Sequence, residues 1–190
     1  MKKIQTIQSF YYLRNTPFGA IAVVWSVYQE QPKILRVLLS NSSDSAEQLV
    51  KILFPHSISS SCAELDVIAD RILAFLTGDD IRFSLDIARL DRCSNFQQQV
   101  LRVEHGIPRG QVSTYQRIAR YLGMNNSARA VGTALANNPF PIIIPCHRAI
   151  RSDETLGGYQ GGLEMKRALL EMEGVSFGDN GSVATRNFFY

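Results

Sequence analysis

The pattern of apolar residues changes character near the middle of the chain, and this change most constrains the fold. Three β-rich apolar runs separated by turn residues come first, at Phe10–Leu13, Ala20–Val27 and Ile34–Leu39. Two stretches with helical spacing follow, at Ser45–Phe54 and Ala63–Leu76. The simplest assembly for this order is a sheet with helices packed on it.

A polar stretch at Asp86–Asn95, interpreted as a linker, separates this region from a helical one, and one more short strand is expected before it at Ile81–Leu85. A chain of 190 residues is long enough for two small domains. We therefore predict a small α/β domain at 1–88, a mainly helical domain at 89–178 and a tail at 179–190. The tail is expected to be loose unless its final aromatic residues dock.

In the second half a helix is predicted at Leu163–Glu173, ended by Gly174, and three helices are predicted before it. The first has apolar residues on one face and ends at Gly106. The second begins with a capping box in which Ser113 caps the helix and Gln116 returns the bond. The third begins after Ser127 and ends before Pro139, which forbids its continuation. The last two, joined by a tight turn with a glycine, form a candidate helix-turn-helix, although plain structural hairpins have the same pattern.

Charge and composition narrow the function classes. Residues 1–91 carry nine Lys/Arg and ten Asp/Glu and residues 92–177 carry ten and six, so the net charge of +3 arises in the second half. This excess fits a polyanionic partner or a mildly basic solvated surface equally well. No apolar run approaches the ~20 residues of a membrane helix, and no apolar leader follows the first residues. The chain has only three cysteines, and in a chain without an export signal an odd, small number of cysteines indicates free thiols in a reducing compartment. We therefore expect a cytoplasmic protein with no membrane partner.

The chemically informative run is Pro145-Cys146-His147-Arg148, which closes an apolar stretch at Ile142–Ile144 interpreted as a buried strand. A reactive cysteine needs thiolate character from a base or a positive environment, and His147 and Arg148 supply both. An inert buried thiol is the alternative. A carboxylate that orients the histidine would complete the relay. Spacing does not choose among the candidates, which are Asp153, Glu154, Glu164, Glu171 and Glu173.

Several blocks between Phe96 and Val175 together resemble the O6-alkylguanine-DNA alkyltransferases, also called methylated-DNA–protein-cysteine methyltransferases. The blocks are Ser113-Thr114-Tyr115, Ala128-Arg129-Ala130-Val131-Gly132, Asn138-Pro139, Ile144-Pro145-Cys146-His147-Arg148, Gly158-Tyr159-Gln160-Gly161-Gly162-Leu163, Leu169-Leu170 and Glu173-Gly174. The resemblance implies a ribonuclease-H-like sheet with helices in the α/β N-terminal domain. It also implies a winged-helix-like helix-turn-helix in the helical C-terminal domain.

The same resemblance implies a suicide repair protein that flips a damaged guanine out of DNA and moves its O6-alkyl group irreversibly to Cys146. His147 would act as the base through a bridging water, and Glu173 would orient it. Tyr115 would stabilise or protonate the departing guanine. Asn138 would tie the recognition helix to the active-site strand. No cofactor is implied.

The implied partner is double-stranded DNA containing O6-alkylguanine, bound by a monomer through the minor groove. Arg129 would occupy the stack where the flipped base had been, and the small Ala128 and Ala130 beside it would let the helix approach closely. Gln116 and Ser152 are positional candidates for phosphate or sugar contacts, which would make affinity fall with salt.

Departures from the family pattern concern the pocket wall beside Tyr159. Ala149 stands where valine is common, and Gln160 replaces a residue that is small in some members, so both are expected to affect which alkyl groups fit. His56 and Cys62 are too few for the zinc site that some members have, so we expect no metal.

Three alternatives compete with repair. A Cys-His-Glu hydrolase would use the same nucleophile and turn over. A non-catalytic alkylation-damage sensor is disfavoured by Cys146, which such relatives lack. A regulator that uses methylation as a signal is disfavoured because no sensor domain with extra metal-binding cysteines is seen.

Overall fold

The computed structural model describes residues 7–184 and 188–190. Its first half is a four-stranded mixed sheet in the order β3-β2-β1-β4, in which β1, β2 and β3 are antiparallel and the short β4 runs parallel to β1. The elements in chain order are β1 (Phe10–Thr16), β2 (Gly19–Tyr28), β3 (Gln31–Leu39), α1 (Ala46–Leu53), β4 (Ile58–Ser59) and α2 (Ala63–Leu76). The three expected strands and two expected helices are confirmed.

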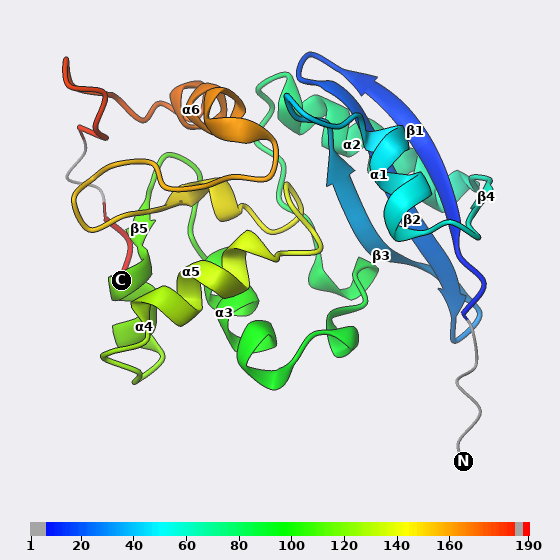
Figure 1. The fold of residues 1–190 in the computed structure, drawn as a ribbon, viewed down its shortest axis with the longest axis horizontal. Helices are drawn as coiled ribbons and strands as arrows, with labels where there is room; N and C mark the ends of the chain where they lie inside the picture. The colour runs from blue at the N-terminus through cyan, green and yellow to red at the C-terminus, as the bar shows by residue number, and fades with distance from the viewer. Residues whose placement is uncertain (1–6, 185–187) are drawn as a thin grey trace.

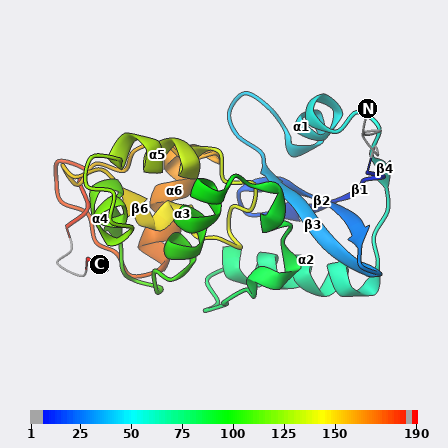
Figure 2. The same cartoon turned by 90° about the horizontal axis from the view of Figure 1, so that it is seen from below.

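Strand β2 is buried on both faces, which explains its unbroken apolar run. Alternate residues of a strand point to opposite faces. Ala22 and Val24 pack with α1, whereas Val23 and Trp25 belong to the cluster that contains the buried side of α2. Figure 2 shows the resulting three layers, with α1 and α2 on opposite faces of the sheet.

Two expectations about the middle of the chain are wrong. Residues 81–84 form no strand and lead into the 3₁₀ turn η1 (Leu85–Ile87). Asp86–Asn95 is not a free linker, because the Arg89 amide donates to the Ile34 carbonyl at 2.9 Å and Leu90, in η2 (Leu90–Arg92), is buried. Its few apolar residues were sufficient to anchor an otherwise polar segment on β3.

The second half is mainly helical, with one short parallel pair of strands, β5 and β6. The elements are α3 (Asn95–His105), β5 (Ser113–Thr114), α4 (Tyr115–Tyr121), α5 (Ala128–Ala136), η3 (Cys146–Arg148), β6 (Ala149–Ile150) and α6 (Gly162–Met172). The predicted cap of α4 is displaced by one residue. Thr114, not Ser113, accepts from the Arg117 amide, and Ser113 pairs with Ala149 in the strand.

The run Ile142–Ile144 is buried as expected, but it is not a strand. It forms a tight turn in which the Ile144 amide donates to the Phe140 carbonyl at 2.8 Å, and Ile142 has a φ of 73°. Pro141 and Pro145 flank it, and a proline has no N–H to contribute to a sheet ladder. Apolar composition therefore predicted the burial of this run correctly and its backbone conformation wrongly.

The end of the chain is docked rather than loose. The Phe189 amide donates to the Val112 carbonyl at 2.8 Å, and Ser113 Oγ donates to the Phe189 carbonyl at 2.8 Å. Tyr190 donates its hydroxyl to the Val103 carbonyl at 3.0 Å, and its ring lies 4.0 Å from that of Tyr121. The final aromatic residues thus connect α3, α4 and β5.

The sheet half and the helical half lie side by side, with the chain running from one to the other through η1 and η2 (Figure 1). A continuous apolar cluster includes Val37 from the sheet and Leu101 and Ile143 from the helical half. The Val37 amide also donates to the Pro139 carbonyl at 2.8 Å, so the sheet supports the segment that precedes Cys146. No helix among the described residues is long and apolar enough to cross a membrane.

Candidate active site

Cys146 lies at the start of the turn η3 and is 6% exposed. Its amide donates to the Ile144 carbonyl at 2.8 Å, and the Arg148 amide donates to the Pro145 carbonyl at 2.9 Å. Pro145 fixes the entry to this turn. The turn therefore holds the side chains of Cys146, His147 and Arg148 in a fixed and largely buried arrangement.

Glu173, which follows α6, brings His147 and Arg148 together. His147 Nε2 lies 2.9 Å from Glu173 Oε1, and Arg148 donates to both carboxylate oxygens, at 2.7 and 2.8 Å. Such a two-point guanidinium pair fixes the carboxylate firmly. With Nε2–H donating to Glu173, His147 Nδ1 is the basic nitrogen, and it is buried without a hydrogen-bond partner among the described residues.

Arg148 therefore acts on the carboxylate rather than directly on the thiol. Besides Glu173, it donates to the Ile107 carbonyl at 2.6 Å. The sequence had suggested Arg148 as part of the positive environment of Cys146. Its guanidinium instead neutralises Glu173, which leaves His147 as the neighbouring base.

Burial opposes the ionised forms of Cys146, His147 and Glu173, and their hydrogen-bonding partners decide which of the three is charged. Burial raises the pKa of Cys146 to about 12, although a hydrogen bond from Asn138 partly offsets it. Burial also lowers the pKa of His147, against its bond to Glu173. For Glu173, burial is outweighed by the bonds from His147 and Arg148, and its pKa falls to about 2. The resting site thus holds a neutral thiol, a neutral imidazole and a carboxylate.

Asn138 lies just beyond the C-cap of α5, which is Asn137, and is fully buried. Its side-chain nitrogen donates to the Ile144 carbonyl at 3.1 Å, and its oxygen accepts from the Phe140 amide at 2.9 Å. It therefore connects the end of α5 to the turn that carries Cys146.

A cavity of about 380 Å³ opens beside Cys146. Tyr115, the first residue of α4, forms part of its wall, and a Cβ atom on Gly157 would lie 2.7 Å from the Tyr115 hydroxyl. Gly157 also has a φ of +66°, so both space and conformation require glycine there. The residues lining the cavity are Tyr115, Gly132, Leu135, Ala136, Cys146, Arg151, Gly157, Gly158, Tyr159 and Gln160.

The expected pocket-wall residues have different surroundings. Tyr159 lines the cavity, and its hydroxyl is buried without a partner among the described residues. Gln160 also lines it, and its amide donates to the Asn138 carbonyl at 2.7 Å and the Ala136 carbonyl at 3.2 Å. Ala149 is fully buried in β6 and does not line the cavity.

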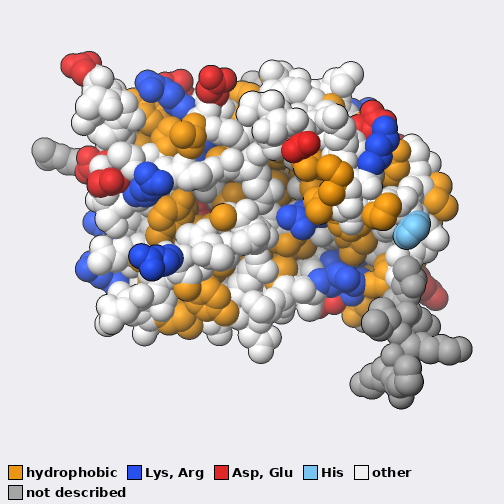
Figure 3. All heavy atoms as spheres, in the orientation of Figure 1, with side chains coloured by type: hydrophobic (Ala, Val, Ile, Leu, Met, Phe, Trp, Pro, Cys, Tyr) orange, Lys and Arg blue, Asp and Glu red, His pale blue; other side chains and the backbone are white. Residues whose placement is uncertain are grey.

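The expected DNA-contacting residues lie on α5 and beside α4. Arg129 and Ala130 are exposed and Ala128 is half-buried near the start of α5. Ser152 Oγ donates to Gln116 Oε1 at 3.4 Å, which brings these two residues together at the surface. Figure 3 shows several basic side chains over the part of this face where Figure 1 draws α4 and α5.

Comparison with known proteins decides the family. Residues 95–175 match the family model described as the DNA binding domain of 6-O-methylguanine DNA methyltransferase. A methylated-DNA–protein-cysteine methyltransferase of Salmonella typhimurium is 33% identical over 167 residues, which cover 84% of this chain and 92% of that protein. The chain belongs to the methylated-DNA–protein-cysteine methyltransferase family.

Other members of this family agree in part of their length or in structure. The protein of the same name from Methanothermobacter thermautotrophicus is 49% identical over 107 residues, 56% of this chain. The match spans 60% of that relative, which is less than two thirds of its length. The crystal structure of Mycobacterium tuberculosis OGT in complex with DNA aligns at 30% identity with a TM-score of 0.67, covering 86% of this chain and 92% of that one.

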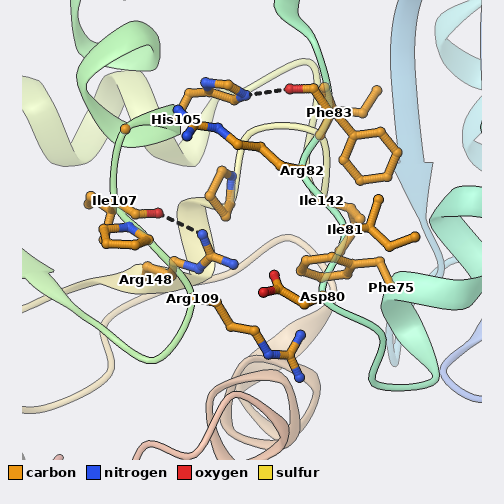
Figure 4. Close-up of a pocket in the computed structure, with 14 residues that line it drawn as sticks. Phe75, Asp80, Ile81, Arg82, Phe83, His105, Ile107, Arg109, Ile142 and Arg148 are labelled. Atoms are coloured by element: carbon orange, nitrogen blue, oxygen red, sulfur yellow. Dashed lines mark hydrogen bonds between the residues drawn. The ribbon is translucent and has the colours of Figure 1, made fainter.

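A second cavity, of about 370 Å³, lies where the two halves of the methyltransferase fold meet. It contacts Pro145 and Arg148 but not Cys146. Figure 4 shows Arg148 bonded to the Ile107 carbonyl, and His105 bonded at 2.8 Å to the Phe83 carbonyl. Arg148 directs its other donors to Glu173, so one wall of this cavity is formed by a residue of the Arg148–Glu173 pair. The cavity does not contain the nucleophile Cys146.

Two buried charged residues near the candidate active site were missed, namely Glu104 and Lys166. Each lies on the apolar side of its helix, with Val100 and Leu101 in α3 and with Met165 and Leu169 in α6. A charged residue in a core-facing position was the available signal, because such residues are rarely buried without a reason. Within the described residues, no group of three or more His, Cys, Asp or Glu is placed to hold a metal ion.

Proposed function

We propose that this protein repairs DNA by direct reversal, transferring the alkyl group of O6-alkylguanine irreversibly to Cys146. The observation that carries the proposal is the bond between His147 and Glu173 directly after Cys146 in the η3 turn, together with a cavity that both Cys146 and Tyr115 line. All four lie within the segment that matches the family model. A base that reaches a buried thiol must leave the duplex, so the damaged guanine is flipped into the cavity.

The transfer is a nucleophilic displacement at the alkyl carbon. His147 takes the Cys146 proton, through a bridging water as the family resemblance implies, and Glu173 stabilises the resulting imidazolium. The Cys146 sulfur then forms the S–C bond as the C–O6 bond breaks, and the electron pair leaves on the guanine. The product is a stable thioether with no step that regenerates the thiol, so one molecule repairs one lesion.

Tyr115 is suited to protonate the departing guanine, because it lines the cavity that contains Cys146 and its phenol is protonated at neutral pH. Burial raises the pKa of this hydroxyl to about 12, so the proton is given up only as negative charge develops on the guanine. Asn138 supports the geometry by connecting α5 to the Cys146 turn. Tyr159 and Gln160 form part of the wall, and Ala149, which is fully buried and does not line the cavity, affects the pocket only indirectly.

The proposed partner is double-stranded DNA, contacted by a monomer through the minor groove. The Mycobacterium tuberculosis relative was crystallised in complex with DNA. Arg129 and Ala130 are exposed near the start of α5, beside the half-buried Ala128, which supports a close approach to the groove and a guanidinium that fills the stack left by the flipped base. Gln116 and Ser152 provide neighbouring polar contacts. We place the protein in the cytoplasm, associated with DNA.

Intact-mass spectrometry after incubation with a duplex containing O6-methylguanine tests the proposal. We expect one methyl group per protein, mapped to Cys146, even with the lesion in excess. Cys146→Ala should bind DNA but gain no methyl, whereas the matched Cys93→Ala should react like the unaltered protein. An absent adduct would contradict repair and favour a sensor, and steady turnover of an ester would favour the hydrolase.

A further inference from the structure

Glu104 and Lys166 are buried charged residues with no place in the proposed reaction. Glu104 belongs to α3 and Lys166 to α6, and each is 0% exposed. Burying a charge costs free energy unless it is paired and hydrogen-bonded. The buried Lys166 ammonium has hydrogen-bond acceptors, whereas the buried Glu104 carboxyl has no donors among the described residues. This difference affects the ionisation of Cys146.

Lys166 is supplied with acceptors. Its Nζ donates to the Ala149 carbonyl at 2.6 Å and to the Gly158 carbonyl at 3.4 Å. Ala149 follows the Cys146 turn directly, and Gly158 lines the cavity. The ammonium therefore connects two segments of the site and places a positive charge behind the nucleophile, where it favours the thiolate.

Glu104 is not supplied with donors. Both of its carboxyl oxygens are buried without a hydrogen-bond partner among the described residues, and no cation there lies within ion-pair distance of it. The charged groups that act on it are Lys166 from α6 and Arg148 from η3, and they do not compensate for its burial, so its pKa rises to about 8. Near neutral pH the side chain is a neutral acid.

When Glu104 loses its proton, the groups that face it are affected in one direction. Its negative charge raises the pKa of Cys146 in η3, of Tyr115 in α4 and of Tyr190 in the tail. It also favours the protonated form of Lys166, whose pKa burial lowers to about 8. While Lys166 remains protonated, an ionised Glu104 makes the nucleophile harder to form and Tyr115 a weaker proton donor, so both effects oppose alkyl transfer.

We propose that Glu104 is a positioning residue for alkyl transfer, which in its protonated form leaves the Lys166 ammonium unopposed behind Cys146 and in its ionised form cancels that charge. This inference rests on the proposed alkyl transfer to Cys146. Glu104 in α3 would thus influence the reaction through its charge, although the residues proposed to touch the substrate belong to other elements.

The test is Glu104→Gln, which imitates the protonated acid at all pH values. Single-turnover methyl transfer from a saturating duplex with O6-methylguanine is followed by quenched intact mass between pH 6 and 8, at constant ionic strength. We expect the rate of the variant to lie within about two-fold of the unaltered protein at pH 6.5. The ratio of the two rates should rise by about two- to three-fold between pH 6.5 and 8, because over this range only the unaltered protein gains a negative charge at position 104 while Lys166 is still largely protonated.

Controls separate this effect from a structural one. Glu64→Gln, at an exposed position on α2, should give a flat ratio across the range. A flat ratio for Glu104→Gln, or a ten-fold loss already at pH 6.5 in a folded variant, would overturn the inference. If the variant does not fold, carboxyl NMR titration of the unaltered protein decides, since a Glu104 carboxyl already ionised at pH 6 would overturn it too. Absence of Cys146 methylation in the unaltered protein would instead defeat the proposed function.

Discussion

At the scale of single residues, Glu173 is a buried carboxylate whose ionised form is stabilised by its two partners. Its side chain is 2% exposed, and Arg148 and His147 hold it ionised, with a pKa of about 2 against an ordinary 4.5. A carboxyl whose pKa is lowered on folding contributes stability that is present above the unfolded value and lost as pH falls through the folded one. Its contribution should therefore be full above about pH 4.5 and disappear toward about pH 2.

Glu173→Gln should accordingly reduce the free energy of unfolding by on the order of 3 kcal/mol at pH 7. The deficit should shrink as the pH is lowered from about 4.5 toward 3. Urea unfolding followed by Trp25 fluorescence measures it. Glu171→Gln, which removes the exposed pair with Arg167 on the same helix, should cost less than about 1 kcal/mol. A deficit for Glu173→Gln that stays constant from pH 7 to 3 would show that the carboxylate is not held by its charge.

At the scale of elements, the end of the chain supports the helix that presents Tyr115. The Phe189 backbone bonds to Val112, just before β5, and to Ser113 in β5, and Tyr190 bonds to α3 and packs on α4. Replacing Phe189 and Tyr190 together by alanine should lower the free energy of unfolding by about 2 kcal/mol, from lost apolar burial and one hydrogen bond. It should also slow methyl transfer, because Thr114 caps α4 from the strand that the tail holds.

The control for that pair is Val67→Ala, an apolar truncation at a position on α2 that is 59% exposed, which should change stability by less than about 0.5 kcal/mol. Chemical denaturation and single-turnover mass measurements give both readouts. Unchanged stability with the tail residues removed would mean that the docked aromatic residues contribute no net support to β5 and α4.

Elements also show where sequence reasoning reached its limit. Periodicity located the main strands and helices because each pattern depends on local burial. The cap of α4 was misplaced because Ser113 is held by Phe189, which is 76 positions away. The local pattern likewise suggested Cys146 and His147 but not their carboxylate. Glu173 followed from family resemblance alone, since a contact 26 positions apart leaves no trace in spacing.

At the scale of the whole molecule, the two halves share one apolar cluster rather than meeting at a wet boundary. The boundary predicted at residue 88 falls in a segment that bonds to β3, since the Arg89 amide donates to the Ile34 carbonyl. On the other side, Val37 bonds to Pro139, next to the Asn138 that supports Cys146. Loss of the sheet would therefore expose the core beneath the active site.

We expect the halves to unfold together. Trp25, the single tryptophan, is buried in β2, and Cys146 is buried in the helical half, so the two residues report on the halves separately. Along a urea series, Trp25 fluorescence and pulse alkylation of Cys146, read by peptide mass, should give the same midpoint, as for one cooperative unit. Leu39→Ala, in the shared cluster, should move both midpoints equally. A Cys146 midpoint well below or above that of Trp25 would instead show two independently stable domains, and the sheet would then be a neighbour of the site rather than its support.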